Sequence, residues 1–290
     1  MPLIAHEVCL TQYNSLGIEC TAARVAFPLS EGEVLDIYRE TPDVRKVVLG
    51  RGSNILLSRR HYGPQYLFVS TRLMDEVRLR GEAIHAKAGA TLSHVSWFAL
   101  EKSLQGLEFL EDIPGTVGGA IIMNAGTYGR TISQIVDRIT YLDCASLQIV
   151  EEEVRDGDFR TRGSRWEGGS EVILSCDFRG AAGDYQAILD QIQHIKKGRY
   201  QKQPRDYPNA GSVFKKPLVD GRELEVWRLI DEAGLRGFHR NDAWISEKHT
   251  GFIVNKGRAT YEDIIAVVDE ARLRVRERFG VQLELEWKVI

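Results

Sequence analysis

Glu111-Asp-Ile-Pro-Gly-Thr-Val-Gly-Gly-Ala-Ile-Ile-Met-Asn-Ala-Gly-Thr-Tyr-Gly129 is the stretch of this sequence that decides the fold. Pro114 fixes φ and has no N–H donor. Three glycines, Gly115, Gly118 and Gly119, allow backbone conformations and close approaches that a Cβ would forbid. Such a backbone can direct several N–H groups at one anionic group, such as a diphosphate. The same residues also suit a buried turn between two core elements, so the segment alone leaves both interpretations open.

A second glycine-bearing segment, Gly50-Arg-Gly-Ser-Asn-Ile-Leu-Leu57, follows the apolar run at residues 47–49. This order predicts a strand that leads into a tight turn bearing hydroxyl and amide groups. The dinucleotide fingerprint G-x-G-x-x-G between a strand and a helix is missing from the sequence. A bound dinucleotide would therefore have to be held in a different way from that of a Rossmann fold.

The composition is that of an ordinary globular protein. The chain has 290 residues, of which 43% are hydrophobic and 27% charged, and its formal net charge is -3. This length is typical of two or three domains, and the charge gives no reason to expect nucleic acid or a membrane surface. Four scattered cysteines without CxxC pairing predict reduced thiols in the cytoplasm and no metal site. We see no signal peptide, and no apolar run approaches the roughly 18 residues of a membrane-spanning helix.

Short strands and few helices predict an α+β protein rather than a repeating βαβ pattern. Strands are expected at residues 23–28, 44–49, 66–70 and 83–89, followed by a meander at 139–142, 148–152 and 171–176. Helices are expected at residues 91–103 and after Ser30-Glu-Gly-Glu33, which has the form of a capping box.

An amphipathic helix expected at residues 184–199 predicts the connection to a second domain. We therefore place one domain at residues 1–185 and another at 186–290. The second domain is expected to contain helices at 224–233 and 260–279, and strands at 243–246, 250–255 and 281–290.

The two glycine-bearing segments and three later motifs resemble those of the UDP-N-acetylenolpyruvoylglucosamine reductase (MurB) family, in its shorter type. The resemblance extends from about Asn14 to Glu286. It implies a two-part flavin-binding domain of the vanillyl-alcohol-oxidase (PCMH) type, followed by a C-terminal α+β substrate domain. It also implies a cytoplasmic enzyme of peptidoglycan precursor synthesis, with FAD as cofactor, NADPH as hydride donor and a UDP-sugar as substrate. Because neither glycine-bearing segment contains a histidine, we expect the FAD to be noncovalent.

The resemblance implies a set of cofactor-binding residues in the two glycine-bearing segments. These residues are Gly50, Gly52, Ser53, Asn54, Pro114, Gly115, Thr116, Gly118, Gly119, Asn124 and Gly129.

Ser212 lies in Asn209-Ala-Gly-Ser-Val-Phe-Lys215. Taken alone it is an ordinary turn hydroxyl, and the missing G-x-S-x-G motif argues against a nucleophilic serine. The segment matches the family motif N-A-G-S-x-F-K, whose serine donates a proton to the substrate. The neighbouring Lys215 is the nearest candidate in sequence to assist this serine.

Arg162, in Phe159-Arg-Thr-Arg-Gly-Ser164, would usually be a solvated surface residue. It matches the arginine of the family motif F-x-Y-R-x-S, which faces the enolpyruvyl carboxylate, although Thr161 stands where tyrosine is usual. A guanidinium can bind a carboxylate bidentately.

Glu286, in Leu283-Glu-Leu-Glu-Trp287, would by itself indicate a half-exposed edge strand. It matches the active-site glutamate of the family's L-E-P-E-V-R, with Trp287 at the valine position. In the basic stretch around Ser212, the family's diphosphate contacts suggest Lys202 and Lys216 as substrate-binding residues.

Asn241-Asp242 is the largest departure from the family pattern, which usually has two glycines here. It keeps open a flavin oxidoreductase of the same fold acting on a different nucleotide-sugar. A non-catalytic paralogue is the other alternative, but it would be expected to lose Ser212, Arg162 or Glu286. The sequence does not predict an oligomeric state.

Overall fold

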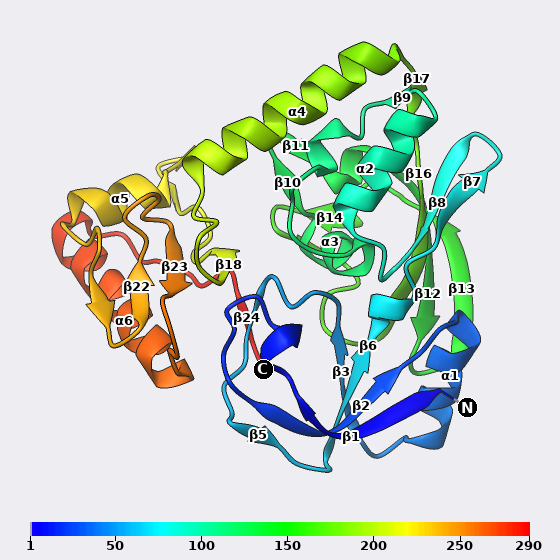
Figure 1. Cartoon of the computed structure of the whole chain (residues 1–290), viewed down its shortest axis with the longest axis horizontal. Helices are drawn as coiled ribbons and strands as arrows, with labels where there is room; N and C mark the ends of the chain where they lie inside the picture. The colour runs from blue at the N-terminus through cyan, green and yellow to red at the C-terminus, as the bar shows by residue number, and fades with distance from the viewer. Residues whose placement is uncertain (1) are drawn as a thin grey trace. The chain divides into compact units, whose positions relative to one another are not determined.

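The structure is a computed structural model that describes residues 2–290, in which the chain forms two compact units (Figure 1). Unit 1 comprises residues up to Val8, Ala22–Arg51 and Gly63–Arg199, and unit 2 comprises Cys9–Thr21, Gly52–Tyr62 and Tyr200–Ile290. The boundary predicted at residues 185/186 left Cys9–Thr21 and Gly52–Tyr62 in the first domain. Gly52–Tyr62 joins unit 2 here, because β4 (Ile55–Leu56) pairs in parallel with the C-terminal strand β24 (Lys288–Val289). Cys9–Thr21 joins it because Leu16 and Ile18 are buried in its core.

The first sheet of unit 1 has the strand order β1-β2-β6-β3. Its strands are β1 (Leu3–Cys9), β2 (Thr21–Phe27), β6 (Tyr66–Ser70) and β3 (Arg45–Leu49). Helix α1 (Glu31–Glu40) packs Ile37 against Leu67 and Val69 of β6. The helix begins as the sequence predicts, because Ser30 Oγ accepts a hydrogen bond of 3.2 Å from the Glu33 N–H.

The second sheet of unit 1 has the order β13-β12-β16-β8-β7, which confirms the three strands predicted at 139–142, 148–152 and 171–176. The predicted meander is wrong, because β12 lies between β13 and β16 and pairs with both. Its strands are β13 (Gln148–Glu153), β12 (Val136–Asp143), β16 (Glu171–Phe178), β8 (Ala83–Lys87) and β7 (Val77–Arg80). Apolar side chains of this sheet form the largest core of unit 1 with residues of α2 (Leu92–Glu101) and α3 (Val117–Met123). Helix α4 (Tyr185–Lys202) packs Ile188 and Ile192 against Leu100 of α2.

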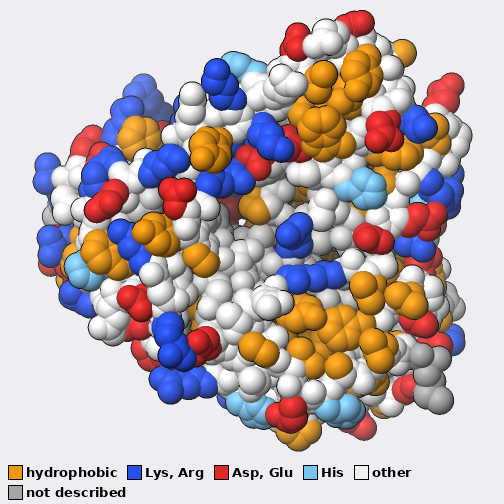
Figure 2. Space-filling model, in the orientation of Figure 1, with side chains coloured by type: hydrophobic (Ala, Val, Ile, Leu, Met, Phe, Trp, Pro, Cys, Tyr) orange, Lys and Arg blue, Asp and Glu red, His pale blue; other side chains and the backbone are white. Residues whose placement is uncertain are grey.

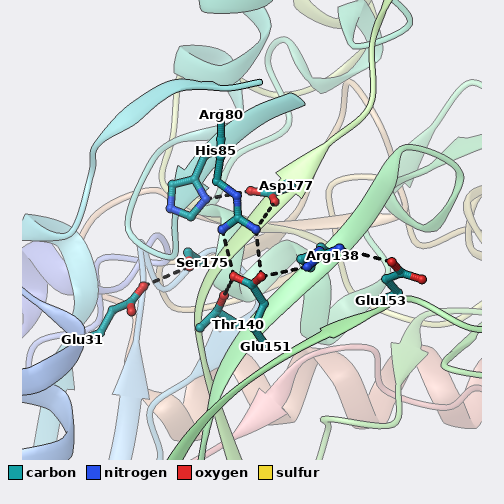
Figure 3. A network of polar contacts seen from close by, with 9 residues as sticks. All are labelled: Glu31, Arg80, His85, Arg138, Thr140, Glu151, Glu153, Ser175 and Asp177. Carbon is teal, nitrogen blue, oxygen red and sulfur yellow. Dashed lines mark hydrogen bonds and ion pairs between the residues drawn. The ribbon is translucent and has the colours of Figure 1, made fainter. Parts of the chain in front are cut away.

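A network of charged and polar side chains lies on this second sheet of unit 1 (Figure 3). Arg80 binds both carboxylate oxygens of Glu151 at 2.8 Å and reaches Asp177 at 3.0 Å. Asp177 also lies 2.7 Å from Nδ1 of the buried His85. At the start of α1, Glu31 accepts a hydrogen bond of 3.0 Å from Ser175 of β16. The buried Asp177 carboxylate is thereby paired with Arg80 and His85, as burial away from water requires.

Unit 2 is built on the antiparallel sheet β18-β23-β22-β21. Its strands are β18 (Asn209–Ser212), β23 (Phe252–Asn255), β22 (Ala243–Ile245) and β21 (His239–Arg240). The sheet shares a core with α5 (Val226–Glu232) and α6 (Tyr261–Phe279), which confirms both predicted helices. Helix α6 begins at a capping box of Thr260 with Asp263 and ends at Gly280, whose φ is 69°.

The strand predicted at residues 281–290 is wrong for most of its length. Only β24 is regular, and residues 281–287 are held by single backbone contacts, among them an isolated bridge between Leu285 and Phe214. The alternation that suggested a strand is real, because Val281, Leu283 and Trp287 are buried. It reflects packing into the core of unit 2 rather than a continuous ladder.

Short elements complete the described chain. The 3-10 helices are η1 (Thr11–Tyr13), η2 (Thr71–Leu73), η3 (Glu108–Leu110) and η4 (Ile132–Gln134). The paired short strands are β9 (Leu104–Gln105) with β17 (Ala181–Ala182), β10 (Gly126–Thr127) with β11 (Arg130–Thr131), β14 (Phe159–Arg160) with β15 (Gly163–Ser164), and β19 (Leu218–Val219) with β20 (Arg222–Glu223). A further short strand is β5 (His61–Tyr62).

Charged side chains of both signs are interspersed on the face of the molecule in Figure 2. Within residues 2–290, no helix is both long and apolar enough to cross a membrane. In the same range, no cluster of three or more His, Cys, Asp or Glu side chains is arranged to hold a metal ion.

Candidate active site

The first glycine-rich stretch forms the start of a helix that the sequence did not predict, α3. Thr116 is its N-cap residue, and the next two N–H groups are bound within unit 1. Val117 N–H donates to Ala90 O and Gly118 N–H donates to Ala88 O, each at 2.9 Å. These two amides fasten the loop to the end of β8, so a diphosphate would have to be bound by other amides of the segment.

Gly118 and Gly119 face different surroundings. A Cβ on Gly118 would lie 3.1 Å from Ala88 Cβ and 3.3 Å from Ala88 O, so this glycine is required by packing inside the protein. Gly119 is exposed, and a Cβ there would have only Thr116 Oγ1 nearby, at 3.8 Å. The open side of the loop is therefore at Gly119, where a cofactor could approach the backbone closely.

The two glycine-bearing segments meet at Gly50 and Thr116. A Cβ on Gly50 would overlap Thr116 Oγ1, so only glycine allows this approach. Arg72 supports the turn, with hydrogen bonds from Nε to Gly50 O at 3.0 Å and from Nη2 to Arg51 O at 3.3 Å. Arg72 was not among the predicted site residues, because it lies in η2, 22 residues from Gly50, and belongs to no motif.

Glu111 is a buried carboxylate at the start of the glycine-rich stretch, with 2% of its surface exposed. Its Oε1 lies 3.2 Å from Lys196 Nζ, whereas Oε2 has no hydrogen-bond partner within residues 2–290. A buried acceptor without a donor is unfavourable unless a ligand supplies one. The donor groups of a flavin dinucleotide fit this requirement, as the open backbone at Gly119 fits its diphosphate.

Asn124 ends α3 in a left-handed conformation, with φ of 42°. Its Nδ2 donates to Arg160 O at 3.1 Å, and its Oδ1 accepts from Ser133 N–H at 3.2 Å. The sequence resemblance implies a cofactor contact for Asn124. In the structure its side-chain amide also fastens α3 to the hairpin of β14 and β15.

Arg162 lies in the turn of that hairpin with φ of 56°, a conformation that non-glycine residues rarely adopt. Its Nη1 donates to Gly126 O at 3.4 Å, and Ser164 Oγ ties the hairpin to Ile122 O at 3.2 Å. The preceding residue, Thr161, is exposed. Backbone strain of this kind persists where the surroundings over-determine it, often at functional sites.

Within unit 2, the turn at Gly52 packs against Tyr13, and Asn54 contacts the C-terminal segment. Gly52 has φ of 64°, and a Cβ there would overlap the carbonyl oxygen of Tyr13. Asn54 Nδ2 donates to Glu286 O at 3.3 Å, and Lys288 N–H donates to Asn54 O at 3.0 Å. The turn that follows Gly52 is thereby fixed beside the backbone of a predicted catalytic residue.

Ser212 follows a β-bulge at the end of β18. Asn209 pairs with Val254 and Ser212 with Phe252, so β18 has one residue more than β23 between these pairs. Gly211 absorbs the irregularity with φ of 75°. Bulges of this kind redirect the side chain that follows, and Ser212 is exposed.

Glu286 is brought next to this strand by its own backbone. Its N–H donates to Val213 O at 2.8 Å, directly beyond Ser212. Two of the predicted catalytic residues, far apart in sequence, are therefore carried by adjacent segments of unit 2. Lys215, the candidate in sequence to assist Ser212, pairs its ammonium group with Glu284.

The predicted substrate-binding lysines both lie on the surface. Lys202 is exposed at the end of α4, and Lys216 pairs with Glu225 at 2.6 Å. Arg199, in the same basic stretch, is instead buried and donates to Thr127 Oγ1 at 3.2 Å. It therefore fixes α4 within unit 1.

The motif that begins at Ser246 forms a turn between β22 and β23. Ser246 Oγ accepts from the N–H groups of Lys248 and His249 at 3.2 and 3.3 Å. Burial lowers the pKa of His249, which favours the neutral imidazole at physiological pH.

Known proteins are similar to this chain over nearly its whole length. Residues 203–290 match the sequence model of the UDP-N-acetylenolpyruvoylglucosamine reductase C-terminal domain, and residues 22–147 match that of an FAD binding domain. The reductase of Clostridium novyi is 34% identical over 99% of this chain and 92% of its own length. The reductase of Caldicellulosiruptor bescii is 38% identical over 97% of this chain and 88% of its own.

A crystal structure of the reductase from Thermus caldophilus has the same fold, with a TM-score of 0.83 and 28% identity over 100% of this chain and 99% of that one. The predicted α+β fold, with an FAD-binding domain of the PCMH type and the family's own C-terminal domain, is confirmed. The chain belongs to the UDP-N-acetylenolpyruvoylglucosamine reductase family.

Proposed function

We propose that this protein is an FAD-dependent reductase that uses NADPH to convert UDP-N-acetylglucosamine enolpyruvate to UDP-N-acetylmuramate in peptidoglycan precursor synthesis. Besides family membership, one observation carries the proposal. Ser212 and Glu286 are presented by adjacent segments of unit 2, joined by the hydrogen bond from Glu286 N–H to Val213 O. A proton donor and a carboxylate are thus available together for one reaction.

The reaction adds a hydride to the terminal carbon of an enol ether conjugated to a carboxylate, and a proton to the α-carbon. When bound, FAD would supply the hydride that NADPH provides. Between the two additions, negative charge builds up on the enolate of the substrate. The protein must hold that charge and deliver a proton.

We assign one of these tasks to each predicted catalytic residue. The Arg162 guanidinium binds the substrate carboxylate and offsets its developing charge. Glu286 holds the enol form, and the Ser212 hydroxyl gives its proton to the α-carbon. We assign the diphosphate of the substrate to Lys202 and Lys216, and the ion pair of Lys216 with Glu225 must then open on binding.

We infer that the flavin is noncovalent, because neither glycine-bearing segment offers a histidine for a covalent link. Acid precipitation of the purified protein is expected to release the yellow colour into the supernatant. Colour that stays with the pellet would overturn the noncovalent assignment. A colourless protein that cannot be reconstituted with FAD would overturn the proposed function itself.

The alternative of a different nucleotide-sugar rests on Asn241-Asp242 and on Thr161. The contacts of Asn241 and Asp242 favour a structural role. Asn241 has φ of 46° in the turn between β21 and β22, and it donates to Asp263 Oδ1 of α6 at 2.6 Å. Asp242 accepts from Arg258 N–H at 2.8 Å. Both side chains fasten the loop that precedes α6, so this departure does not by itself support a change of substrate.

The substitution Ser212→Ala tests the proposal. Reoxidation of reduced flavin by the enolpyruvyl substrate is expected to slow by about 10²- to 10⁴-fold in stopped-flow measurements, as is typical for loss of a general acid. Reduction of the flavin by NADPH requires no such donor and should stay near the wild-type rate.

The matched control is Ser58→Ala, also in unit 2, which removes a hydroxyl hydrogen-bonded to Ile290 O. It should leave both half-reactions near wild type. Reoxidation at the wild-type rate in Ser212→Ala would remove Ser212 from the mechanism. Equal slowing of both half-reactions would show instead that the variant disturbs the flavin site.

A further inference from the structure

Trp287 contacts the bulge that presents Ser212. Its indole Nε1–H donates a hydrogen bond of 2.8 Å to the carbonyl oxygen of Ala210, two residues before Ser212. The Trp287 side chain is 3% exposed and belongs to the core of unit 2. A rigid, buried side chain therefore holds one specific backbone group of the bulge.

The bulge needs such a partner. Its extra residue interrupts the ladder between β18 and β23, and Ala210 is buried with 1% of its surface exposed. A buried carbonyl group requires a donor, and the indole N–H supplies one from outside the sheet. The conformation of the backbone that leads into Ser212 thus depends on Trp287.

Trp287 also follows Glu286 directly in the chain. Glu286 N–H donates to Val213 O and Lys288 N–H donates to Asn54 O, so residues 286–288 are fixed on both sides by backbone bonds. The indole adds a third link, from this segment to Ala210. Two of these links, at Val213 and Ala210, lie on either side of Ser212 and define the register between its strand and the segment of Glu286. The third link joins that segment to Asn54.

We propose that Trp287 is a positioning residue, which fixes Ser212 relative to Glu286 through the carbonyl oxygen of Ala210. The inference rests on the proposed function, in which Ser212 delivers the proton. Valine, the residue of the family motif at this position, has no hydrogen-bond donor. The link is therefore specified by this chain's own sequence at Trp287.

The test is Trp287→Phe, which keeps an aromatic ring in the core and removes the N–H. Flavin reoxidation by the enolpyruvyl substrate is expected to slow about 10-fold or more, since small misplacement of a reacting group is costly. Flavin reduction by NADPH should change less than about twofold. The solvent deuterium isotope effect on reoxidation should rise, because proton delivery becomes more rate-limiting.

Trp166→Phe is the matched control. Trp166 is fully buried in unit 1, and its Nε1 has no hydrogen-bond partner within residues 2–290. The substitution removes the same atoms from a core without breaking a hydrogen bond, so both half-reactions should stay near wild type. If Trp287→Phe folds poorly, benzothienylalanine at position 287 keeps the bicyclic shape without the N–H and should slow reoxidation in the same way.

A double-mutant cycle separates this proposal from the proposed function. In the Ser212→Ala background, Trp287→Phe should cause no further slowing if it acts through Ser212. Equal slowing in both backgrounds would overturn the positioning role. Wild-type reoxidation in Trp287→Phe, with slow reoxidation in Ser212→Ala, would overturn the positioning role alone. Wild-type reoxidation in Ser212→Ala would overturn the role of Ser212 and the positioning role with it.

Discussion

Arg162 in unit 1 and Ser212 in unit 2 are both presented by irregular backbone, but the two regions place the conformational constraint on different residues. In the hairpin of β14 and β15, Arg162 itself has the left-handed conformation, with φ of 56°. In the bulge of β18, Gly211 has it, with φ of 75°, and the serine follows in ordinary backbone. The left-handed backbone conformation is therefore adopted by Arg162 itself in one region, and by Gly211, the neighbour of Ser212, in the other.

This difference has a consequence for substitution. A non-glycine residue in the left-handed region is disfavoured by roughly 1–2 kcal/mol, whereas glycine adopts it at no steric cost. Stability and activity should therefore conflict at Arg162, where glycine would suit the backbone and only arginine suits the chemistry. At Ser212 they should not conflict, because a separate residue meets each requirement.

The largest effect is expected for Arg162→Gly. Loss of the guanidinium should lower the rate of flavin reoxidation by substrate about 100-fold or more. Compared with Arg162→Ala, which loses the same guanidinium but keeps the strain, Arg162→Gly should be more stable by about 1 kcal/mol. Urea unfolding measures the stability difference, and stopped-flow measures the rates. Equal stability of the two variants would show that the turn is not strained.

A second effect is expected at the adjacent glycines of α3, where packing replaces φ as the constraint. Gly118→Ala would press a methyl group against Ala88 and should destabilise the apoprotein by about 1–3 kcal/mol. Gly119→Ala is the matched control and should leave the apoprotein at least as stable, since glycine within a helix is unfavourable. Its effect should instead be weaker retention of FAD, measured from the flavin-to-protein ratio. Full retention would place the cofactor elsewhere than at Gly119.

Helix α3 is an element that could not be predicted from its own residues, unlike the cap of α1. Capping at Ser30 and the strands of the second sheet were predictable, because they depend on neighbouring residues and on strand periodicity. Their pairing order was not, because it depends on contacts between distant segments. Helix α3 was not, because Val117-Gly-Gly-Ala120 has a poor helix propensity. Its first amides are bound instead by the carbonyl groups of Ala88 and Ala90, which are distant in sequence.

The residues of the candidate site also fall into two groups, those predicted from sequence motifs and those found only in the structure. The sequence predicts roles for the motif residues Ser212, Arg162 and Glu286 through their resemblance to a family. It did not identify Arg72 or the hydrogen bond of Trp287, because these residues act through backbone carbonyl groups far along the chain. A contact that uses only a backbone atom of its partner leaves no trace in that partner's residue type.

A smaller effect is expected for Gly211→Ala, which tests the other half of the comparison. No atom of another residue lies near a Cβ at this position, so the change adds only the strain of φ, about 1 kcal/mol. If the bulge yields to relieve that strain, Ser212 should move and flavin reoxidation should slow, while reduction by NADPH should not.

Gly234→Ala is the matched control, since Gly234 has φ of 74° and similarly open surroundings at the end of α5. It should lose the same stability without slowing reoxidation. If both variants keep wild-type rates, the rest of unit 2 holds the bulge in place. Gly211 then affects only the stability of the protein and not the position of Ser212.

The smallest effect is expected in the polar network on the second sheet of unit 1, where charge rather than backbone conformation is the constraint. Arg80 chiefly, and also Arg138, lower the pKa of Glu151 to about 2, from an ordinary value of about 4.3. Because this pKa is depressed in the folded state, the stability that Glu151 contributes is present above about pH 4.3 and is lost as the pH falls through about 2.

Glu151→Gln should therefore make the melting temperature of the protein less dependent on pH between about 2 and 4.3, and lower it at neutral pH. The effect is small because the Glu151 side chain is 36% exposed, and solvent weakens its ion pairs. Glu153→Gln is the control, since Glu153 is 75% exposed and pairs only with Arg138 among residues 2–290. Calorimetry across this pH range should give Glu153→Gln nearly the same dependence of melting temperature on pH as the wild type. If the melting temperatures of wild type and Glu151→Gln change with pH in parallel, Glu151 does not couple the folding of unit 1 to pH.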